Sequence, residues 1–164
     1  MAICVTGTPG TGKTSLSRLL EKVTGYKRID VKRLIVTKKL AYSYDKERRC
    51  LVVDTRKLTA ELKKVLSKND KVIIDSLLSH HLPKKYVSTC FVTKCDLAVL
   101  NKRLEKRKYS KKKIRENLDA EIFDICLTEA QQNRHHVAVI NTTKGIKRKE
   151  VLSLLSGVSH ESAG

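Results

Sequence analysis

The stretch AICVTGTPGTGKT, residues 2–14, decides the fold of this 164-residue chain. Residues 2–6 are apolar enough to form a buried strand, and residues 7–14 follow the pattern G-x-x-x-x-G-K-[ST]. A helical pattern with Leu16, Leu19 and Leu20 on one face begins directly afterwards. A strand, a glycine-rich loop and a helix in this order predict a loop that wraps around nucleotide phosphates. A glycine-rich turn without a ligand would not need the Lys-Thr pair at residues 13–14.

Each residue type in this loop has a chemical role. Glycines such as Gly10 and Gly12 allow positive φ, so that backbone N–H groups can close around phosphate oxygens. The Lys13 ammonium can reach the β- and γ-phosphates, and the Thr14 hydroxyl can ligate Mg²⁺. A second carboxylate ligand should follow a neighbouring apolar strand, and Asp75 after residues 72–74 is the candidate. The alternative for Asp75 is a turn former or N-cap. The predicted cofactors are ATP, as a purine nucleoside triphosphate, and Mg²⁺.

Short apolar runs alternate with helical patterns along the rest of the chain. Further strands are predicted over residues 71–75, 88–93 and 136–141, and helices over 14–23, 31–40, from 55, from 97, 111–131 and 146–155. Strands separated by helices of this length predict βαβ units, and therefore a doubly wound α/β fold with helices on both faces of a parallel sheet. Residues 156–164 are small and polar, and we expect a flexible tail there.

Charge is the second strong signal, because the chain has 35 Lys and Arg residues but only 17 Asp and Glu residues, a formal net charge of +18. The length fits one domain, and 40% hydrophobic residues exclude a wholly disordered chain. No apolar run approaches the roughly 18 residues that span a bilayer. We therefore expect a cytoplasmic protein with an anionic partner, which could be a nucleotide, RNA, an acidic protein or an anionic membrane surface.

The cysteines are odd in number and form no C-x-x-C pair. Their pattern favours structural thiols in a reducing compartment, and the spacing of Cys90, Cys95 and the histidines does not fit a zinc knuckle. The five are Cys4, Cys50, Cys90, Cys95 and Cys126.

A GTPase is disfavoured, because residues 93–96 carry the Lys and Asp of a guanine-reading N-K-x-D loop but lack its Asn. Basic helices after both the second and the third strand regions suit phosphoryl transfer between nucleotides instead. Such an enzyme needs an acceptor site and a basic lid that excludes water.

Five stretches of the chain resemble the adenylate kinase isoenzyme 6 family of broad-specificity nucleoside monophosphate (NMP) kinases and ATPases. They are residues 7–14, YD at 44–45, VIID at 72–75 with Pro83 eight residues later, RLEKRKY at 103–109 and NLDAEIF at 117–123. The resemblance extends from about residue 3 to residue 155. It implies a P-loop NTPase fold, a three-layer αβα sandwich with a five-stranded parallel sheet.

The resemblance also implies roles for individual positions. It implies one domain over residues 1–155, with an NMP-binding segment at 30–53 and a lid at 106–115. Catalytic roles are implied for Lys13, Asp75 and Arg107, and Mg²⁺ ligation for Thr14 and Asp75. Nucleotide contacts are implied for Gly10, Thr11, Gly12, Lys13, Thr14, Ser15, Arg107 and Lys144.

Two departures from the family pattern concern hydrolysis and the lid. The family places a histidine implicated in ATP hydrolysis two residues after the aspartate, and this chain has Leu77 there. Leucine cannot orient water, so ATPase activity stays open, and so does a role for His80 or His81. In the lid, Lys108 replaces a usual glycine, which we expect to stiffen the hinge.

The acceptor segment departs as well. Val36 stands where the family suggests an acceptor-binding arginine, and Arg33 or Lys32 are the candidates to replace it.

The leading hypothesis is a monomeric kinase that transfers the ATP γ-phosphoryl to AMP, dAMP or another NMP. Residues 101–115 hold nine basic residues and one acid, more charge than phosphate handling needs. Because the family is implicated in maturation of the small ribosomal subunit, the alternative is an ATP-gated assembly factor that binds a ribosomal protein and rRNA. A third hypothesis is a nucleotide-binding RNA protein without catalysis. The basic residues could also be only a solvated face.

Overall fold

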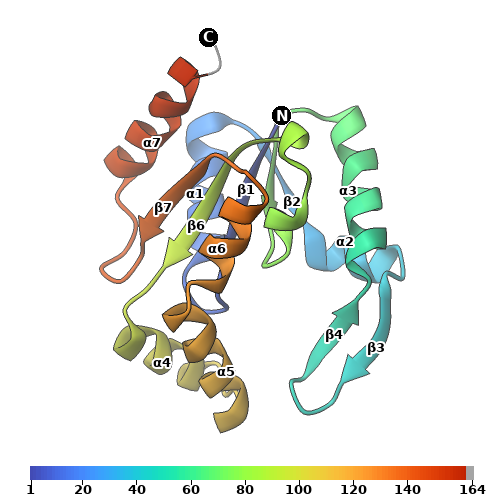
Figure 1. The fold of residues 1–164 in the computed structure, drawn as a ribbon, viewed down its shortest axis with the longest axis vertical. Coiled ribbons are helices and arrows are strands. Elements are labelled where there is room, and N and C mark those ends of the chain that lie inside the picture. The colour runs from blue at the N-terminus through green and yellow to red at the C-terminus, as the bar shows by residue number, and fades with distance from the viewer. Residues whose placement is uncertain (162–164) are drawn as a thin grey trace.

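Strand β1, Ala2–Gly7, lies at the centre of a five-stranded parallel sheet, and all six of its residues are buried. The computed structural model describes residues 1–161. The strand order is β2-β5-β1-β6-β7 (Figure 1). The other strands are β2 Lys27–Asp30, β5 Val72–Asp75, β6 Val87–Lys94 and β7 Val137–Asn141. The predicted α/β fold with a five-stranded parallel sheet is confirmed.

Alternate residues of β1 enter two separate cores, one on each face of the sheet. Ile3 and Val5 pack with α1, Lys13–Thr24, and α7, Arg148–Glu161. Ala2 and Cys4 pack on the opposite face. The helices there are α2 Val31–Thr37, α3 Thr55–Lys68 and α6 Ile125–Gln132. The result is the three-layer αβα arrangement.

Helices α4, Leu97–Lys106, and α5, Lys111–Ile122, enclose a third small core around Leu100 and Leu104. Figure 1 shows α4, α5 and the two-stranded β3–β4 hairpin at the same end of the molecule, beyond the carboxyl ends of β6 and β7. Ligands of parallel α/β sheets bind at this end, so these elements frame the candidate site.

Three strands were not predicted from the sequence. β2 is a short edge strand with the charged sequence KRID and no fully buried residue. β3, Ala41–Asp45, and β4, Cys50–Val53, form an antiparallel hairpin that is also largely exposed. Since exposed edge strands carry no apolar run, hydrophobic patterning does not detect them.

The single helix predicted over residues 111–131 is wrong. Two helices, α5 and α6, are separated at Asp124, whose φ of 52° is left-handed. Aspartate tolerates this conformation better than most residues, and Lys94 forms an ion pair with its carboxylate. The break depends on a contact 30 residues away in the chain, which local sequence does not reveal.

The carboxyl terminus also differs from expectation. Residues 156–161 continue α7 where a flexible tail was predicted, because extending a formed helix adds one hydrogen bond for each residue fixed. Residues 162–164 of the predicted tail lie outside the described residues.

All five cysteines are free thiols, and only Cys50 is exposed. Burial raises the pKa of Cys90 to about 12, which makes this thiol unreactive, as expected of a structural cysteine. Within residues 1–161, no helix has the length and apolar character needed to span a membrane.

Candidate active site

The loop between β1 and α1 has the shape of a phosphate cradle. Gly7, Gly10 and Gly12 all have positive φ, between 94° and 138°. A Cβ on Gly7 would lie 2.3 Å from Thr93 Oγ1 and 2.6 Å from the Thr93 carbonyl oxygen, so no other residue fits there. The glycines therefore serve both the turn and its close contact with β6.

Lys13 lies across the mouth of this loop. Its Nζ donates to the carbonyl oxygens of Gly7 at 2.6 Å and Thr8 at 3.1 Å. Burial lowers the pKa of Lys13 to about 8, although the nearby Cys126 and Asp75 partly oppose the shift. A lysine whose charge is satisfied only by two carbonyls can turn to a bound phosphate, which is a stronger partner.

Threonine side chains brace the loop from the ends of two strands. Thr11 Oγ1 contacts Thr93 Oγ1 at 2.6 Å and donates to Thr8 O at 2.7 Å. Thr142, just after β7, donates from Oγ1 to Thr11 O at 2.6 Å. The predicted contact residue Thr11 thus uses its buried side chain to hold the loop, which leaves only its backbone for nucleotide.

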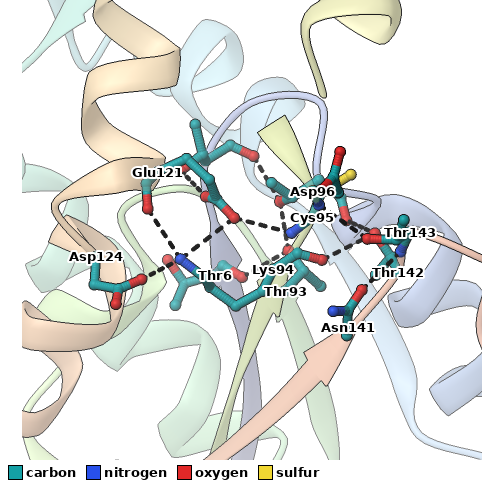
Figure 2. Close-up of polar contacts among 12 residues, drawn as sticks. Thr6, Thr93, Lys94, Cys95, Asp96, Glu121, Asp124, Asn141, Thr142 and Thr143 are labelled. Carbon is teal, nitrogen blue, oxygen red and sulfur yellow. Dashed lines mark hydrogen bonds and ion pairs between the residues drawn. The ribbon is translucent and has the colours of Figure 1, made fainter. Parts of the chain in front are cut away.

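A buried carboxylate on α5 clamps the same loop from the other side (Figure 2). Glu121 is 5% exposed and accepts from Thr8 Oγ1 at 2.6 Å and from the Cys95 backbone N–H at 2.9 Å. Lys94 Nζ lies 3.5 Å from the Glu121 carboxylate and also pairs with Asp124. Glu121 therefore joins the loop, the start of α4 and the end of α5.

A cleft of about 520 Å³ opens beside the loop. Its lining comes from the loop, α1, α4 and the turn after β7, namely Gly10, Gly12, Ser15, Leu19, Arg103, Arg107, Thr142, Gly145 and Ile146. Apolar Leu19 and Ile146 beside backbone and guanidinium groups suit a purine ring next to its phosphates. Predicted Lys144 is exposed and does not line this cleft, although its neighbour Gly145 does.

Arg103 connects the two walls of this cleft. Its Nη1 donates to Gly10 O at 3.4 Å and Thr142 Oγ1 at 3.2 Å, and its Nη2 donates to Thr142 O at 2.9 Å. Arg107, one helical turn further along, is exposed at the end of α4, which leaves its guanidinium available to an anion. Arg103 holds the two walls of the cleft together, and Arg107 lines the same cleft with an exposed side chain.

Asp75 is held against the first turn of α1 by a serine that the sequence analysis did not single out. Ser17 Oγ lies 2.9 Å from Asp75 Oδ2 and 3.1 Å from the Thr14 carbonyl oxygen. Hydroxyl and carboxylate oxygens are the ligands that Mg²⁺ prefers, so the Asp75 carboxylate and the exposed Thr14 side chain fit the predicted ion by their chemistry. Ser17 follows Thr14 by three residues. The sequence feature that could have identified Ser17 is that it is a polar residue on the buried face of α1.

The acceptor side begins at the opposite edge of the sheet. Asp30 at the end of β2 is in register with Asp75 at the end of β5. Asp30 also caps α2 by accepting from the Arg33 backbone N–H at 2.9 Å. The side chains of Lys32, Arg33 and Val36 are all exposed on α2, so either basic residue is free to reach an anion.

The β3–β4 hairpin of the predicted acceptor segment contacts the lid. Arg48 forms two hydrogen bonds to the Glu116 carboxylate, from Nε at 2.9 Å and Nη2 at 2.8 Å. Lys112 pairs with Glu47 at 2.7 Å, and Lys113 bonds to the Arg48 carbonyl. These contacts hold the β3–β4 hairpin against the first half of α5.

Sequence comparisons agree with this geometry. A family model described as an AAA domain matches residues 3–124. The adenylate kinase isoenzyme 6 homolog of Dictyostelium discoideum is 34% identical over 142 residues, which cover 84% of this chain and 78% of that protein. A protein of Methanocaldococcus jannaschii named as a candidate adenylate kinase is 34% identical over 161 residues, 98% of this chain and 88% of its own. The chain belongs to the adenylate kinase isoenzyme 6 family.

Solved structures extend the likeness to the fold. A shikimate kinase from Acinetobacter baumannii superimposes with a TM-score of 0.69 at 16% identity, covering 99% of this chain and 95% of its own. A deoxyadenosine kinase from M. mycoides gives 0.61 at 13% identity, covering 97% and 100%. At these identities the match supports a small P-loop kinase fold.

The two departures from the adenylate kinase isoenzyme 6 pattern have structural consequences. Leu77 is 40% exposed, and its carbonyl accepts from Thr6 Oγ1 at 3.1 Å. His80 is buried, and its ring contacts Thr6 Oγ1 and Glu129 Oε2. Lys108 has a φ of 56°, the left-handed conformation that a glycine adopts without strain.

Proposed function

We propose that the protein is a nucleoside monophosphate kinase that transfers the γ-phosphoryl of ATP to AMP, dAMP or another NMP. One observation supports the proposal: the phosphate loop lies between a cleft lined by Arg103 and Arg107 and the β3–β4 hairpin, whose Arg48 is bonded to Glu116 of α5. ATP and the NMP acceptor can therefore lie next to each other over the phosphate loop, covered by the hairpin and α5. Exclusion of water by that cover favours transfer over hydrolysis.

The reaction needs no protein nucleophile. A phosphate oxygen of the NMP attacks the γ-phosphorus, and the bond from γ-phosphorus to the β–γ bridging oxygen breaks as ADP leaves. Lys13 and Arg107 would hold the transferring phosphoryl and spread its negative charge, while the loop N–H groups fix the β-phosphate. Thr14 and Asp75 would hold Mg²⁺, which neutralises phosphate charge when bound.

The acceptor is positioned by the 30–53 segment in this proposal. Arg33 or Lys32 would bind the NMP phosphate in place of the arginine that Val36 replaces. Because Arg33 can form two parallel hydrogen bonds to a phosphate and lysine cannot, Arg33 is the stronger candidate.

A coupled ADP assay tests the proposal. ATP consumption should depend on added AMP, and Lys13→Ala should abolish it, while Lys22→Ala at the exposed end of the same helix leaves it unchanged. Because Leu77 offers no group to orient water, hydrolysis without AMP should be slow. Turnover of ATP that ignores AMP, or no turnover at all, contradicts a kinase.

A second function is favoured by the surface charge of α4 and the lid. Lys102, Lys106, Lys108 and Lys111 are exposed, and none has an ion-pair partner among the described residues. Charges left unpaired in this way are free to neutralise nucleic acid phosphates. We propose as the second candidate an ATP-gated assembly factor of the small ribosomal subunit that binds rRNA and a ribosomal protein.

Binding to small-subunit precursor particles, with and without ATP, separates the two candidates. An assembly factor should bind them with a steep loss of affinity as salt rises, and Lys102→Gln, which lies outside the lid segment, should weaken binding without changing the kinase assay. Absence of salt-sensitive, ATP-dependent binding eliminates the second candidate and leaves the kinase proposal intact.

A further inference from the structure

Three metal-ligating side chains meet outside the cleft, beside the strand that leads into the phosphate loop. They are His80 and His81 of the 3₁₀ turn η1, Ser79–His81, and Glu129 of α6. One ring nitrogen from each histidine and one carboxylate oxygen all lie within 4.8 Å of one another. The two rings are 4.3 Å apart between centroids. The proposed phosphoryl transfer uses none of the three.

The hydrogen bonds around His80 need one more proton than the neutral groups supply. Thr6 Oγ1 lies 3.1 Å from Leu77 O and 2.8 Å from His80 Nδ1, and His80 Nε2 lies 2.8 Å from Glu129 Oε2. A carbonyl and an ionised carboxylate can only accept. Three contacts thus need three protons, but one hydroxyl and one neutral imidazole provide two. An additional cation would satisfy the remaining contact.

A proton is a poor choice for that cation. The His80 side chain is only 2% exposed, so an imidazolium there would lose nearly all of its hydration. A metal ion satisfies the same contact without a proton, because it binds the Nε2 lone pair and the carboxylate together.

We propose that His80, His81 and Glu129 form a binding site for a transition-metal dication of the Zn²⁺ type. Two imidazoles and one carboxylate are a donor set that zinc accepts, and water completes four-coordination. The carboxylate side chain of Glu129 is 40% exposed, so an ion can enter from solvent and His81 and Glu129 can rotate to converge on it.

The surroundings of His80 already have the form of a metal site's outer shell. With Nε2 on the ion, Nδ1–H donates to Thr6 Oγ1, whose own proton goes to the Leu77 carbonyl. The His80 carbonyl is held by His135 Nε2 at 2.8 Å, which fixes the backbone of the turn. Bound metal would therefore tie α6 to the segment after Asp75 and to the strand that enters the phosphate loop.

Co²⁺ and Zn²⁺ titration of the full chain, without nucleotide, tests this site. The background is Cys50→Ser, which removes the exposed thiol as a competing ligand. We expect one Co²⁺ for each chain, with a visible absorption spectrum of tetrahedral nitrogen and oxygen ligation, displaced by Zn²⁺. His81→Ala and Glu129→Gln should each weaken binding roughly tenfold or more. His136→Gln, a histidine outside the cluster, is the matched control and should bind as the parent does.

Thermal unfolding provides a second readout that does not depend on activity. Saturating Zn²⁺ should raise Tm in the Cys50→Ser parent and in His136→Gln, but not in His81→Ala or Glu129→Gln, because a ligand stabilises only the folded form that binds it. Both ligand substitutions alter side chains at the edge of the cluster, so the folded protein remains testable. A parent that binds no Co²⁺, or ligand variants that bind it as tightly as the parent, overturns the proposal.

Discussion

Arg48 at the tip of the β3–β4 hairpin and Glu116 on α5 are 68 positions apart in the chain, yet they form a two-point ion pair with N–O distances of 2.9 and 2.8 Å. Asp45 adds a third contact to the same guanidinium. Hydrogen bonds to Glu116 and then Asp45 raise the pKa of Arg48 and hold the guanidinium charged. This contact joins the β3–β4 hairpin to α5, and in the proposed kinase it would link the acceptor segment to the lid.

Removal of this ion pair should change the kinetics with the NMP acceptor more than it changes the stability of the fold. Arg48→Ala should raise the KM for AMP several-fold and increase AMP-independent hydrolysis, because the cover closes less completely over the acceptor. Steady-state kinetics with varied AMP measure both effects. Lys46→Ala on the same hairpin is the control. Unchanged kinetics in Arg48→Ala would mean that the contact does not contribute to closure.

Lys13 should make nucleotide binding depend on pH in the alkaline range. The free protein has a Lys13 pKa of about 8, so the charged form is complete below that pH and is lost as pH rises through it. ATP affinity should therefore fall between about pH 7.5 and 9.5, and binding near pH 8 should take up a proton, since phosphate stabilises the ammonium. Calorimetry in buffers of different ionisation enthalpy measures that uptake. Lys13→Met should bind weakly at every pH and take up no proton at this site.

The same pKa shift affects folding stability with a definite sign. Between about 8 and the ordinary lysine value of 10.5, the unfolded chain binds more protons at this position than the folded protein does. The free energy of unfolding should therefore increase as pH rises through that window, because the unfolded chain loses the proton that the folded protein has already lost. Urea unfolding of the parent and of Lys13→Met at several pH values isolates the contribution as the difference between the two slopes.

Glu121 should be the most costly single carboxylate to remove. Glu121→Ala leaves the Thr8 hydroxyl and the buried Cys95 N–H without their acceptor, which costs about 1–3 kcal/mol for each unsatisfied buried group. Urea unfolding should show the loss, and ATP affinity should fall because Thr8 belongs to the loop. Glu105→Gln on exposed α4 is the control. Full stability in Glu121→Ala would show that water replaces the carboxylate without cost.

Arg103 and Arg107 should differ in what their removal changes. Arg103→Ala breaks the contacts to Gly10 and Thr142, so it should lower both stability and ATP affinity. Arg107→Ala should leave unfolding unchanged and reduce kcat by roughly 10²–10³, because its charge is proposed to act on the transferring phosphoryl. Lys102→Ala is the control for both. A kcat loss in Arg103→Ala alone would reverse these assignments.

The sequence predicted those parts of the molecule whose signal is local. The loop of residues 7–14 combines a buried strand, fixed glycines and a helix start, and each is visible in a short window. Asp96 as the cap of α4 follows the same logic, since its carboxylate accepts from the Ala98 and Val99 N–H groups two and three residues later.

Features that depend on distant contacts could not be predicted in this way. Ser17 matters because Asp75, 58 positions later, accepts its hydroxyl. Glu121 is buried because Thr8 and Cys95 need its oxygens, whereas in sequence it lies among the polar residues of an apparently solvent-facing helix. The nucleotide contact of Lys144 was implied by the family resemblance alone; its side chain is exposed, and its neighbour Gly145 lines the cleft.

One helix, α5, carries both Glu116, which contacts the hairpin, and Glu121, which contacts the phosphate loop. Five residues of helix span only about 7.5 Å, so the two carboxylates move as parts of one rigid rod. If a bound NMP displaces the hairpin, α5 transmits that displacement to the phosphate loop, which would hold ATP. Thermodynamic reciprocity requires that each substrate alter the affinity for the other by the same factor, so the change in ATP affinity on adding AMP should equal the change in AMP affinity on adding ATP.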